Sequence, residues 1–131
     1  MSPVTFATKS GGGQRVLLVE DHLESATSMS RLLRLFGYRV RVETDGLAAV
    51  ETAKRFAPFA AIIDLTLPTI DGFAVAERLR SSPVTRDALL VAMTGWVTEE
   101  HYRRAMIAGF DKHLVKPISV DALVDALATH V

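Results

Sequence analysis

The 131-residue chain contains no cysteine and no asparagine. The absence of cysteine excludes a disulfide framework and thiolate chemistry, and the absence of asparagine excludes an N-glycosylation acceptor. Both absences suit a protein of the reducing cytoplasm, which is where we expect this one to work.

The sequence also has no excess of either charge and no long apolar run. Fifteen basic and fifteen acidic side chains cancel, so the positive bias typical of nucleic-acid binding is missing and direct binding to nucleic acid is not expected. The longest nearly apolar run, residues 56–63, is far shorter than the roughly 20 residues of a membrane helix. The N-terminus lacks an apolar signal core, so we expect no membrane association.

About half of the residues are apolar (49%), which is enough for one globular core at this length. The first fourteen residues, "MSPVTFATKSGGGQ", are polar and glycine-rich, and they are expected to form a flexible N-terminal tail or linker. A phosphate-binding loop is disfavoured here because no strand precedes the glycines. The folded domain is expected to occupy residues 15–131.

From residue 15 onward, short β-branched runs alternate with segments of helical periodicity. The strands are predicted at 15–20, 38–43, 59–64, 88–93 and 112–116, and the helices at 23–36, 46–56, 71–81, 98–108 and 119–130. This alternation predicts a single doubly wound α/β domain, (βα)5, with a five-stranded parallel sheet covered by helices on both faces. The period of two in "RVRV" favours an edge strand.

Polar residues stand where these predicted strands end: Glu20 and Asp21 after the first, Asp64 after the third, Thr94 after the fourth and Lys116 after the fifth. Ligands of open parallel sheets bind beyond the carboxyl ends of the strands. Taken singly, each residue has an ordinary structural explanation, such as a helix cap, a turn or a solvent-exposed lysine. Together they predict one site.

Three crowded carboxylates would repel one another and raise their own pKa values unless a cation lay between them. Mg²⁺ is the expected cation, bound directly by Asp21 and Asp64 and through water by Glu20; Mn²⁺ could replace it. Asp64 beside such a metal is placed to attack a phosphoryl group. Lys116 and Thr94 could then stabilise the phosphoryl oxygens.

These residues resemble the receiver domain of two-component response regulators over about residues 15–131. The resemblance is carried by "ED" (20–21), "DLTLPTIDG" (64–72), "TG" (94–95) and "KP" (116–117), in order on five strands. It implies the flavodoxin-like strand order 2-1-3-4-5. It also implies that the chain is a signalling domain that catalyses only its own phosphoryl transfer and dephosphorylation.

The resemblance assigns a role to each residue of the site. Asp64 would be the phosphoacceptor, Thr94 the switch hydroxyl and Lys116 the phosphate-contacting lysine. The metal would be held by Glu20, Asp21, Asp64 and the backbone carbonyl of Thr66. Structural roles fall to Pro68, Gly72 and Pro117, with the Lys116–Pro117 bond either cis or trans. The phosphoryl donor would be a histidine kinase, a histidine phosphotransfer domain or a small acyl phosphate.

Three positions bear on switching and on access of water to the site. His113 stands where receivers commonly have tyrosine or phenylalanine, so the coupling could be weaker or pH-sensitive; alternatively it is a half-buried histidine without a switching role. Trp96 and Thr66 would flank the phosphoryl group, and Trp96 is hypothesised to shield the phosphoaspartate from hydrolysis. The other explanation for Trp96 is packing elsewhere in its loop.

Leu35 and Ile107 fall off the apolar stripes of their predicted helices and could contact partners. A homodimer or effector contact is expected through the fourth helix, fifth strand and fifth helix. The motifs look most like receivers attached to hybrid sensor kinases, although free-standing receivers share much of the pattern.

Two other functions compete with phosphoryl signalling. One is a constitutive interaction domain that needs no phosphate, against which the intact set of Asp21, Asp64, Thr94 and Lys116 counts. The other is a small phosphohydrolase, which would need a second acid near Asp64 and a capping insert. Only Asp71 is available as that acid, and no segment is long enough for a cap.

Overall fold

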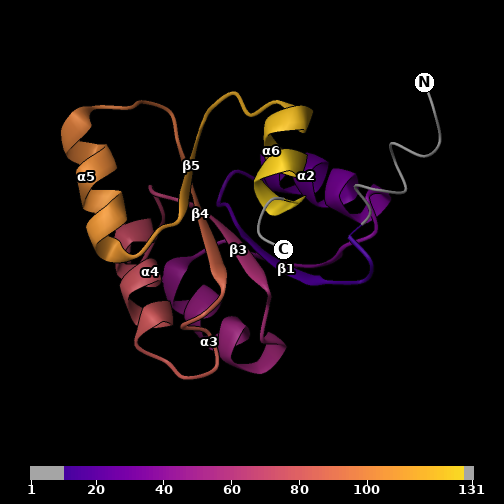
Figure 1. Cartoon of the computed structure of the whole chain (residues 1–131), viewed down its shortest axis with the longest axis horizontal. Helices are drawn as coiled ribbons and strands as arrows, with labels where there is room; N and C mark the ends of the chain where they lie inside the picture. Colours follow the sequence, from indigo (N-terminus) through magenta and orange to yellow (C-terminus); the bar gives the residue numbers. More distant parts are fainter. Residues whose placement is uncertain (1–10, 129–131) are drawn as a thin grey trace.

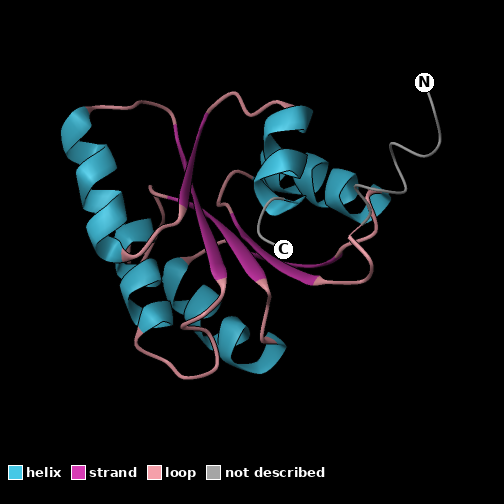
Figure 2. Ribbon diagram, viewed as in Figure 1, coloured by secondary structure: helices cyan, strands magenta, loops and turns pink. Residues whose placement is uncertain are grey.

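The computed structural model describes residues 11–128, in which five parallel strands alternate with five helices (Figure 2). The strands are β1 (Arg15–Val19), β2 (Arg39–Glu43), β3 (Ala60–Asp64), β4 (Leu89–Thr94) and β5 (Lys112–Val115). The helices are α2 (Leu23–Leu35), α3 (Gly46–Phe56), α4 (Gly72–Arg80), α5 (Glu99–Ala108) and α6 (Val120–Ala128). None of these helices is long and apolar enough to cross a membrane.

The strand order is β2-β1-β3-β4-β5, so the predicted fold is confirmed and β2 is an edge strand as expected. β2 shows why its alternating pattern indicated an edge: Val40 is buried, whereas Arg39 and Arg41 are exposed. The central strand β3, in contrast, is buried along its whole length.

Helices cover both faces of the sheet (Figure 1), and a cluster of buried apolar residues lies on each face. Helices α3, α4 and α5 cover one face, where Val50, Leu79 and Ala105 pack against residues of β1, β3 and β4. Helices α2 and α6 cover the other face through Leu33 and Leu127. A rigid sheet buried on both sides leaves the strand ends as the places where polar groups can gather.

Residues 11–14, the last part of the predicted tail, form a turn joined to the end of α2. Gly13 N–H donates to the carbonyl of Gly37 at 2.8 Å, and Gln14 N–H donates to that of Gly11 at 3.0 Å. Gly12 and Gly13 have φ angles of 58° and 79°, a left-handed conformation that favours glycine. Residues 1–10, the rest of the predicted tail, lie outside the described residues.

Side-chain caps explain where most helices start. Asp45 accepts from Ala48 N–H, Asp71 from Ala74 N–H, and Thr98 from His101 N–H, at the starts of α3, α4 and α5. Asp21 does not cap α2, because the N-cap is His22 and its side chain makes no capping bond. The capping explanation for Asp21 is therefore wrong, and this carboxylate is left for the site.

Gly72 lies against the backbone of the β3 end. A Cβ at this position would stand 2.4 Å from the carbonyl oxygen of Asp64 and 2.7 Å from Cα of Leu65. Because backbone atoms, rather than a movable side chain, fill this space, Gly72 lets α4 begin directly beside the strand end that carries Asp64.

We predict that Gly72→Ala destabilises the fold by about 1–3 kcal/mol, the usual cost of forcing an extra carbon into a packed region. Urea unfolding followed by circular dichroism measures the change. Gly95→Ala is the matched control, because a Cβ at Gly95 meets nothing within 4 Å. A Gly72→Ala variant as stable as Gly95→Ala would contradict the close backbone approach.

Candidate functional site

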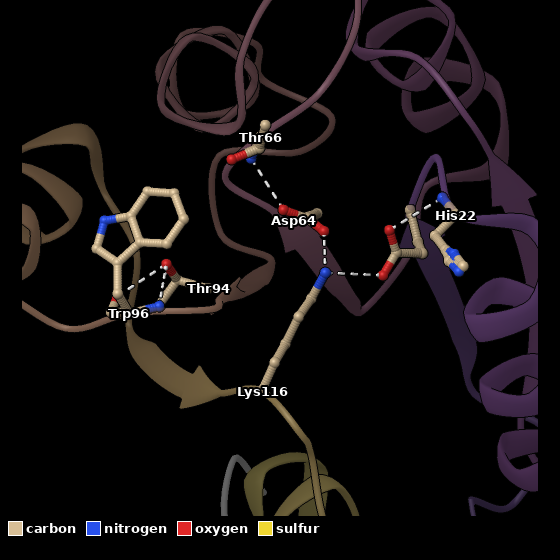
Figure 3. Close-up of polar contacts among 7 residues, drawn as sticks. His22, Asp64, Thr66, Thr94, Trp96 and Lys116 are labelled. Atoms are coloured by element: carbon tan, nitrogen blue, oxygen red, sulfur yellow. Dashed lines mark hydrogen bonds and ion pairs between the residues drawn. The ribbon is translucent and has the colours of Figure 1, made fainter.

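The polar strand-end residues gather at the edge of the sheet between β1 and β3. Glu20 directly follows β1, Asp64 is the last residue of β3, and Lys116 follows β5. The strand order reverses its direction of winding between β1 and β3, which is where open α/β sheets hold their ligands. Figure 3 shows the Lys116 side chain extending from β5 toward Asp64.

Lys116 joins the two buried carboxylates of the site. Its ammonium nitrogen donates to Oε1 of Glu20 at 3.1 Å and also to Oδ2 of Asp64 (Figure 3). Burial alone would lower the pKa of Lys116, but the hydrogen bonds to Asp64 and Glu20 and the attraction of their charges outweigh it and raise the pKa. Lys116 is thus a charged group held in the site, and the solvent-exposed alternative does not describe it.

Glu20 is an acid enclosed by the protein, with 1% of its surface exposed. Burial raises the pKa of Glu20, and the charge of Asp64 adds to this effect. The backbone N–H of His22, 3.2 Å from Oε2, and the Lys116 ammonium act in the opposite direction without cancelling the shift. The raised pKa of Glu20 is therefore due mainly to burial, and the repulsion expected between crowded carboxylates is a smaller contribution.

Asp64 is 5% exposed and both of its carboxylate oxygens have donors. Oδ1 accepts from the backbone N–H of Thr66 at 2.9 Å, and Oδ2 accepts from Lys116. The carboxylate of Asp64 is thereby fixed in direction by the loop that follows β3 and by a side chain from across the sheet.

The third acid, Asp21, completes a group that suits a metal ion. One carboxylate oxygen from each of Glu20, Asp21 and Asp64 can be chosen so that the three lie within 4.8 Å of one another. Asp21 is exposed while the other two are buried, so the cluster opens to solvent on one side. Three carboxylates of this spacing fit a hard divalent cation such as Mg²⁺, which prefers oxygen ligands and retains waters.

Thr94 points its hydroxyl at the loop that follows β4. Its Oγ1 donates to the carbonyl of Trp96 at 2.9 Å and accepts weakly from the Trp96 N–H at 3.4 Å. Figure 3 places this pair on the side of Asp64 away from His22. Thr94 is the last residue of β4, as predicted. Its hydroxyl is bonded within its own loop, which is the ordinary structural role considered for it.

The Trp96 side chain is 55% exposed and rests against α5. Its Nε1–H donates to Nε2 of His101 at 3.4 Å, and the two rings meet edge to face with centroids 5.8 Å apart. His101 in turn has its Nδ1 2.7 Å from the Thr98 hydroxyl. Sequence reasoning missed His101, and no motif marks it, because its role depends on the conformation of the 95–98 loop.

His113 lies on β5 and is half-buried. Among residues 11–128, neither ring nitrogen has a hydrogen-bond partner, and the ring lies 5.8 Å from that of Tyr102. Burial lowers the pKa of His113, and the nearby His101 lowers it further. The imidazole is therefore held predominantly neutral at neutral pH, which fits a packed ring at this position.

The loop residues of the "DLTLPTIDG" and "KP" motifs order the surroundings of the acids. The carbonyl of Pro68 accepts from Gly46 N–H at 3.1 Å, which ties the loop after β3 to the start of α3. The Lys116–Pro117 peptide bond, left open by the sequence, is cis. Thr66 contributes its N–H to Asp64, as described above.

The profile of the response regulator receiver domain matches residues 16–128. The transcriptional regulatory protein PrrA of Mycobacterium tuberculosis is 32% identical over 110 residues, which are 84% of this chain and 46% of PrrA. The sensor histidine kinase RcsC of Salmonella typhi is 28% identical over 129 residues, covering 98% of this chain and 13% of the kinase. The chain therefore spans less than half the length of these curated relatives.

Two solved structures have the same fold as this chain. The receiver domain of a sensor histidine kinase from Pseudomonas aeruginosa PAO1, with a magnesium ion coordinated in its active site cleft, is 30% identical with a TM-score of 0.82, covering 90% of this chain and 96% of that one. A chemotaxis protein of Vibrio cholerae has a TM-score of 0.87 at 24% identity, covering 91% of this chain and 99% of its own. Because the sequence identity to the chemotaxis protein is only 24%, that comparison supports the fold alone.

We predict that Glu20→Gln increases resistance to urea at neutral pH in the presence of EDTA. The amide fills the same space without the buried charge whose burial raises the pKa of Glu20. Because the folded-state pKa is raised, wild-type Glu20 takes up its proton as the pH falls through that pKa. The advantage of the variant is therefore present at neutral pH and lost in acid.

Urea unfolding curves at several pH values test this prediction. Glu77→Gln removes an exposed acid of α4 and should change the free energy of unfolding by no more than about 0.5 kcal/mol at any pH. If Glu20→Gln were less stable than the wild type at neutral pH, the pairing with Lys116 would outweigh the burial of Glu20, contrary to the prediction.

Proposed function

This chain belongs to the response regulator receiver domain family, and from that premise we propose that Asp64 is its phosphoacceptor in a two-component signalling pathway. The observation that carries the proposal is the buried ion-pair network in which the Lys116 ammonium contacts Asp64 and Glu20. A carboxylate oxygen of Asp21 lies within 4.8 Å of an oxygen of Glu20 and of Asp64, close enough for all three acids to bind one metal ion.

In the proposed transfer, a carboxylate oxygen of Asp64 attacks the phosphorus of a phosphohistidine or acyl phosphate. A P–O bond forms to Asp64 while the bond from phosphorus to the donor nitrogen or oxygen breaks, and the donor keeps that electron pair. In dephosphorylation, the oxygen of a water attacks the phosphorus and the bond from phosphorus to the Asp64 oxygen breaks. The Asp64 carboxylate is restored and inorganic phosphate is released. The chain would thus catalyse only reactions of its own side chain.

Three groups would assist this reaction. Mg²⁺, or Mn²⁺ in its place, held by Asp21, Asp64, the Thr66 carbonyl and Glu20 through water, would neutralise charge on the phosphoryl oxygens. Lys116 can transfer its hydrogen bond from the Asp64 carboxylate to a phosphoryl oxygen attached there. Thr94 can do likewise by giving up its bond to the Trp96 carbonyl, which would release the 95–98 loop.

The 95–98 loop is the element through which phosphorylation of Asp64 would change the contacts of α5 and β5. The loop carries Trp96, which contacts His101 on α5, and His113 on β5 lies near α5 through Tyr102. Turning the Thr94 hydroxyl would therefore disturb contacts that lead to α5 and β5. The ring of His113 makes no hydrogen bond within the described part of the chain, so no such bond there would resist a change in its surroundings.

Partner contacts follow from the same region. Large apolar side chains are exposed on α5, β5 and α6, namely Tyr102, Met106, Ile107, Val115 and Val120. This surface supports the expected homodimer or effector contact, and Leu35 of α2, 84% exposed, supports a separate contact. The domain would meet its histidine kinase or phosphotransfer partner in the cytoplasm.

Similarity to the receiver domain of the Pseudomonas sensor histidine kinase and to the kinase RcsC supports attachment to a hybrid kinase. The constitutive interaction domain and the phosphohydrolase are less well supported. A constitutive interaction domain would not need Lys116 to contact two buried carboxylates. A phosphohydrolase would need a second acid near Asp64, and Asp71, the candidate, is engaged as the N-cap of α4.

We predict that incubation with Mg²⁺ and acetyl phosphate adds one phosphoryl group to the wild type and none to Asp64→Asn. Intact-mass spectrometry measures the addition, and a matching experiment in EDTA should show none. Asp71→Asn is the matched control, because it changes an acid of the same loop outside the network. A phosphoryl group on Asp64→Asn, or none on the wild type with either acetyl phosphate or a phosphohistidine donor, would refute the assignment.

We predict that Trp96→Ala shortens the lifetime of the phosphorylated domain several-fold, because the indole limits access of water to the site. The decay of the phosphorylated mass after removal of the donor gives the rate. Trp96→Phe keeps a ring but loses the hydrogen bond to His101, so it separates shielding from loop anchoring. An unchanged lifetime in Trp96→Ala would leave the tryptophan with only a packing role in its loop.

A further inference from the structure

A groove lined by four arginines lies at the opposite end of the sheet from Asp64. It encloses about 550 Å³ beside the edge strand β2 and the last turn of α3. Its lining residues are Arg15, Arg39, Arg41, Thr52, Arg55, Phe56 and Ala57. No acidic side chain of residues 11–128 lines it, although the chain as a whole has a net charge of zero.

Strand register explains why arginines distant in sequence meet here. Arg15 of β1 pairs with Arg39 of β2, and Leu17 pairs with Arg41, so three arginines occupy neighbouring positions on adjacent strands. Side chains two residues apart share a face of a strand. Arg15 therefore shares the face of Leu17, which packs with α3, and Arg55 approaches from α3 itself.

The arginines have few partners of their own. Arg15 donates to the carbonyls of Phe56 and Ala57 at 2.7 and 2.9 Å, which holds the end of α3 in place. Arg41 lies over the Phe56 ring, 5.5 Å from its centroid. Within residues 11–128, none of the four forms an ion pair, and the nearby Glu43 accepts instead from the Thr52 hydroxyl.

Protection of an edge strand against aggregation accounts for charged residues on β2. It does not account for Arg15 on an interior strand or for Arg55 on a helix, both directed to the same groove. Gathering like charges costs free energy, which an anion bound among them would recover.

We propose that this groove binds a small anion carrying two or more adjacent phosphate groups. Guanidinium groups form paired hydrogen bonds with phosphate oxygens, and several of them around one groove match a dense, multiply charged ligand. The volume falls within the range typical of small-molecule sites. The site is separate from Asp64, because it lies at the amino ends of β1 and β2 and the acids lie at the carboxyl ends of β1 and β3.

Isothermal titration with inorganic pyrophosphate, at constant ionic strength and without divalent cations, tests this proposal. We expect the wild type to bind and Arg39→Gln/Arg55→Gln to bind at least about tenfold more weakly, since two charge-assisted contacts are lost. These exposed residues are chosen instead of Arg15 because Arg15 holds the end of α3. Unchanged circular dichroism would confirm that the double variant is folded.

The matched control is Arg31→Gln/Arg78→Gln, which removes the same charge from exposed positions of α2 and α4. It should bind pyrophosphate as the wild type does, and orthophosphate should bind the wild type more weakly. If both double variants bound pyrophosphate equally weakly, the loss of net charge alone would explain the result and the proposal would be overturned. It would also be overturned by a wild type that does not bind, unchanged binding in Arg39→Gln/Arg55→Gln, or binding lost in Lys116→Ala, which would place the anion at the acidic end.

Discussion

The ammonium of Lys116 between two buried carboxylates is the interaction on which the site depends. Glu20 and Asp64 come from different strands and are almost completely buried, and each would be costly to keep charged without a nearby cation. Lys116 reaches them from β5, so a single side chain joins the ends of β1, β3 and β5. The two carboxylates are thereby held close together by a side chain of the domain itself.

The backbone around Asp64 gives this interaction its precision. Asp64 ends a fully buried strand, its carboxylate accepts from Thr66 N–H, and α4 begins against it because Gly72 has no side chain. Functional groups mounted on rigid elements and fixed by hydrogen bonds hold their geometry better than groups on free loops. In the proposed reaction, the Thr66 N–H would keep this carboxylate in its direction if Lys116 turned to a phosphoryl oxygen.

The alternation of apolar runs and helical segments was sufficient to predict five parallel strands and the meeting of Glu20, Asp64 and Lys116 beyond them, and the family resemblance supplied the strand order. Alternating apolar runs specify buried strands, and parallel strands must bring their carboxyl ends to one edge. The sequence was not sufficient for contacts that depend on the choice among nearby partners. The Thr94 hydroxyl chooses the Trp96 carbonyl, and His101 supports Trp96; both depend on loop conformation. The absence of a capping bond at the start of α2 is of the same kind.

The arginine groove illustrates a different limit, because its members become neighbours only through strand register. The zero net charge hides a local separation of charge, with acids at the carboxyl ends of β1 and β3 and guanidinium groups at the amino ends of β1 and β2. A five-residue strand separates the two ends by roughly 15 Å. Distance weakens the interaction of two charges this far apart, but salt screens it less when one of them is buried, as Asp64 is. A charge gained at Asp64 would therefore have a weak direct effect on an anion in the groove. A stronger coupling between the two ends would require a movement of β1 or α3. The position of β1 between β2 and β3 and the dense packing of α3 on the sheet oppose such a movement.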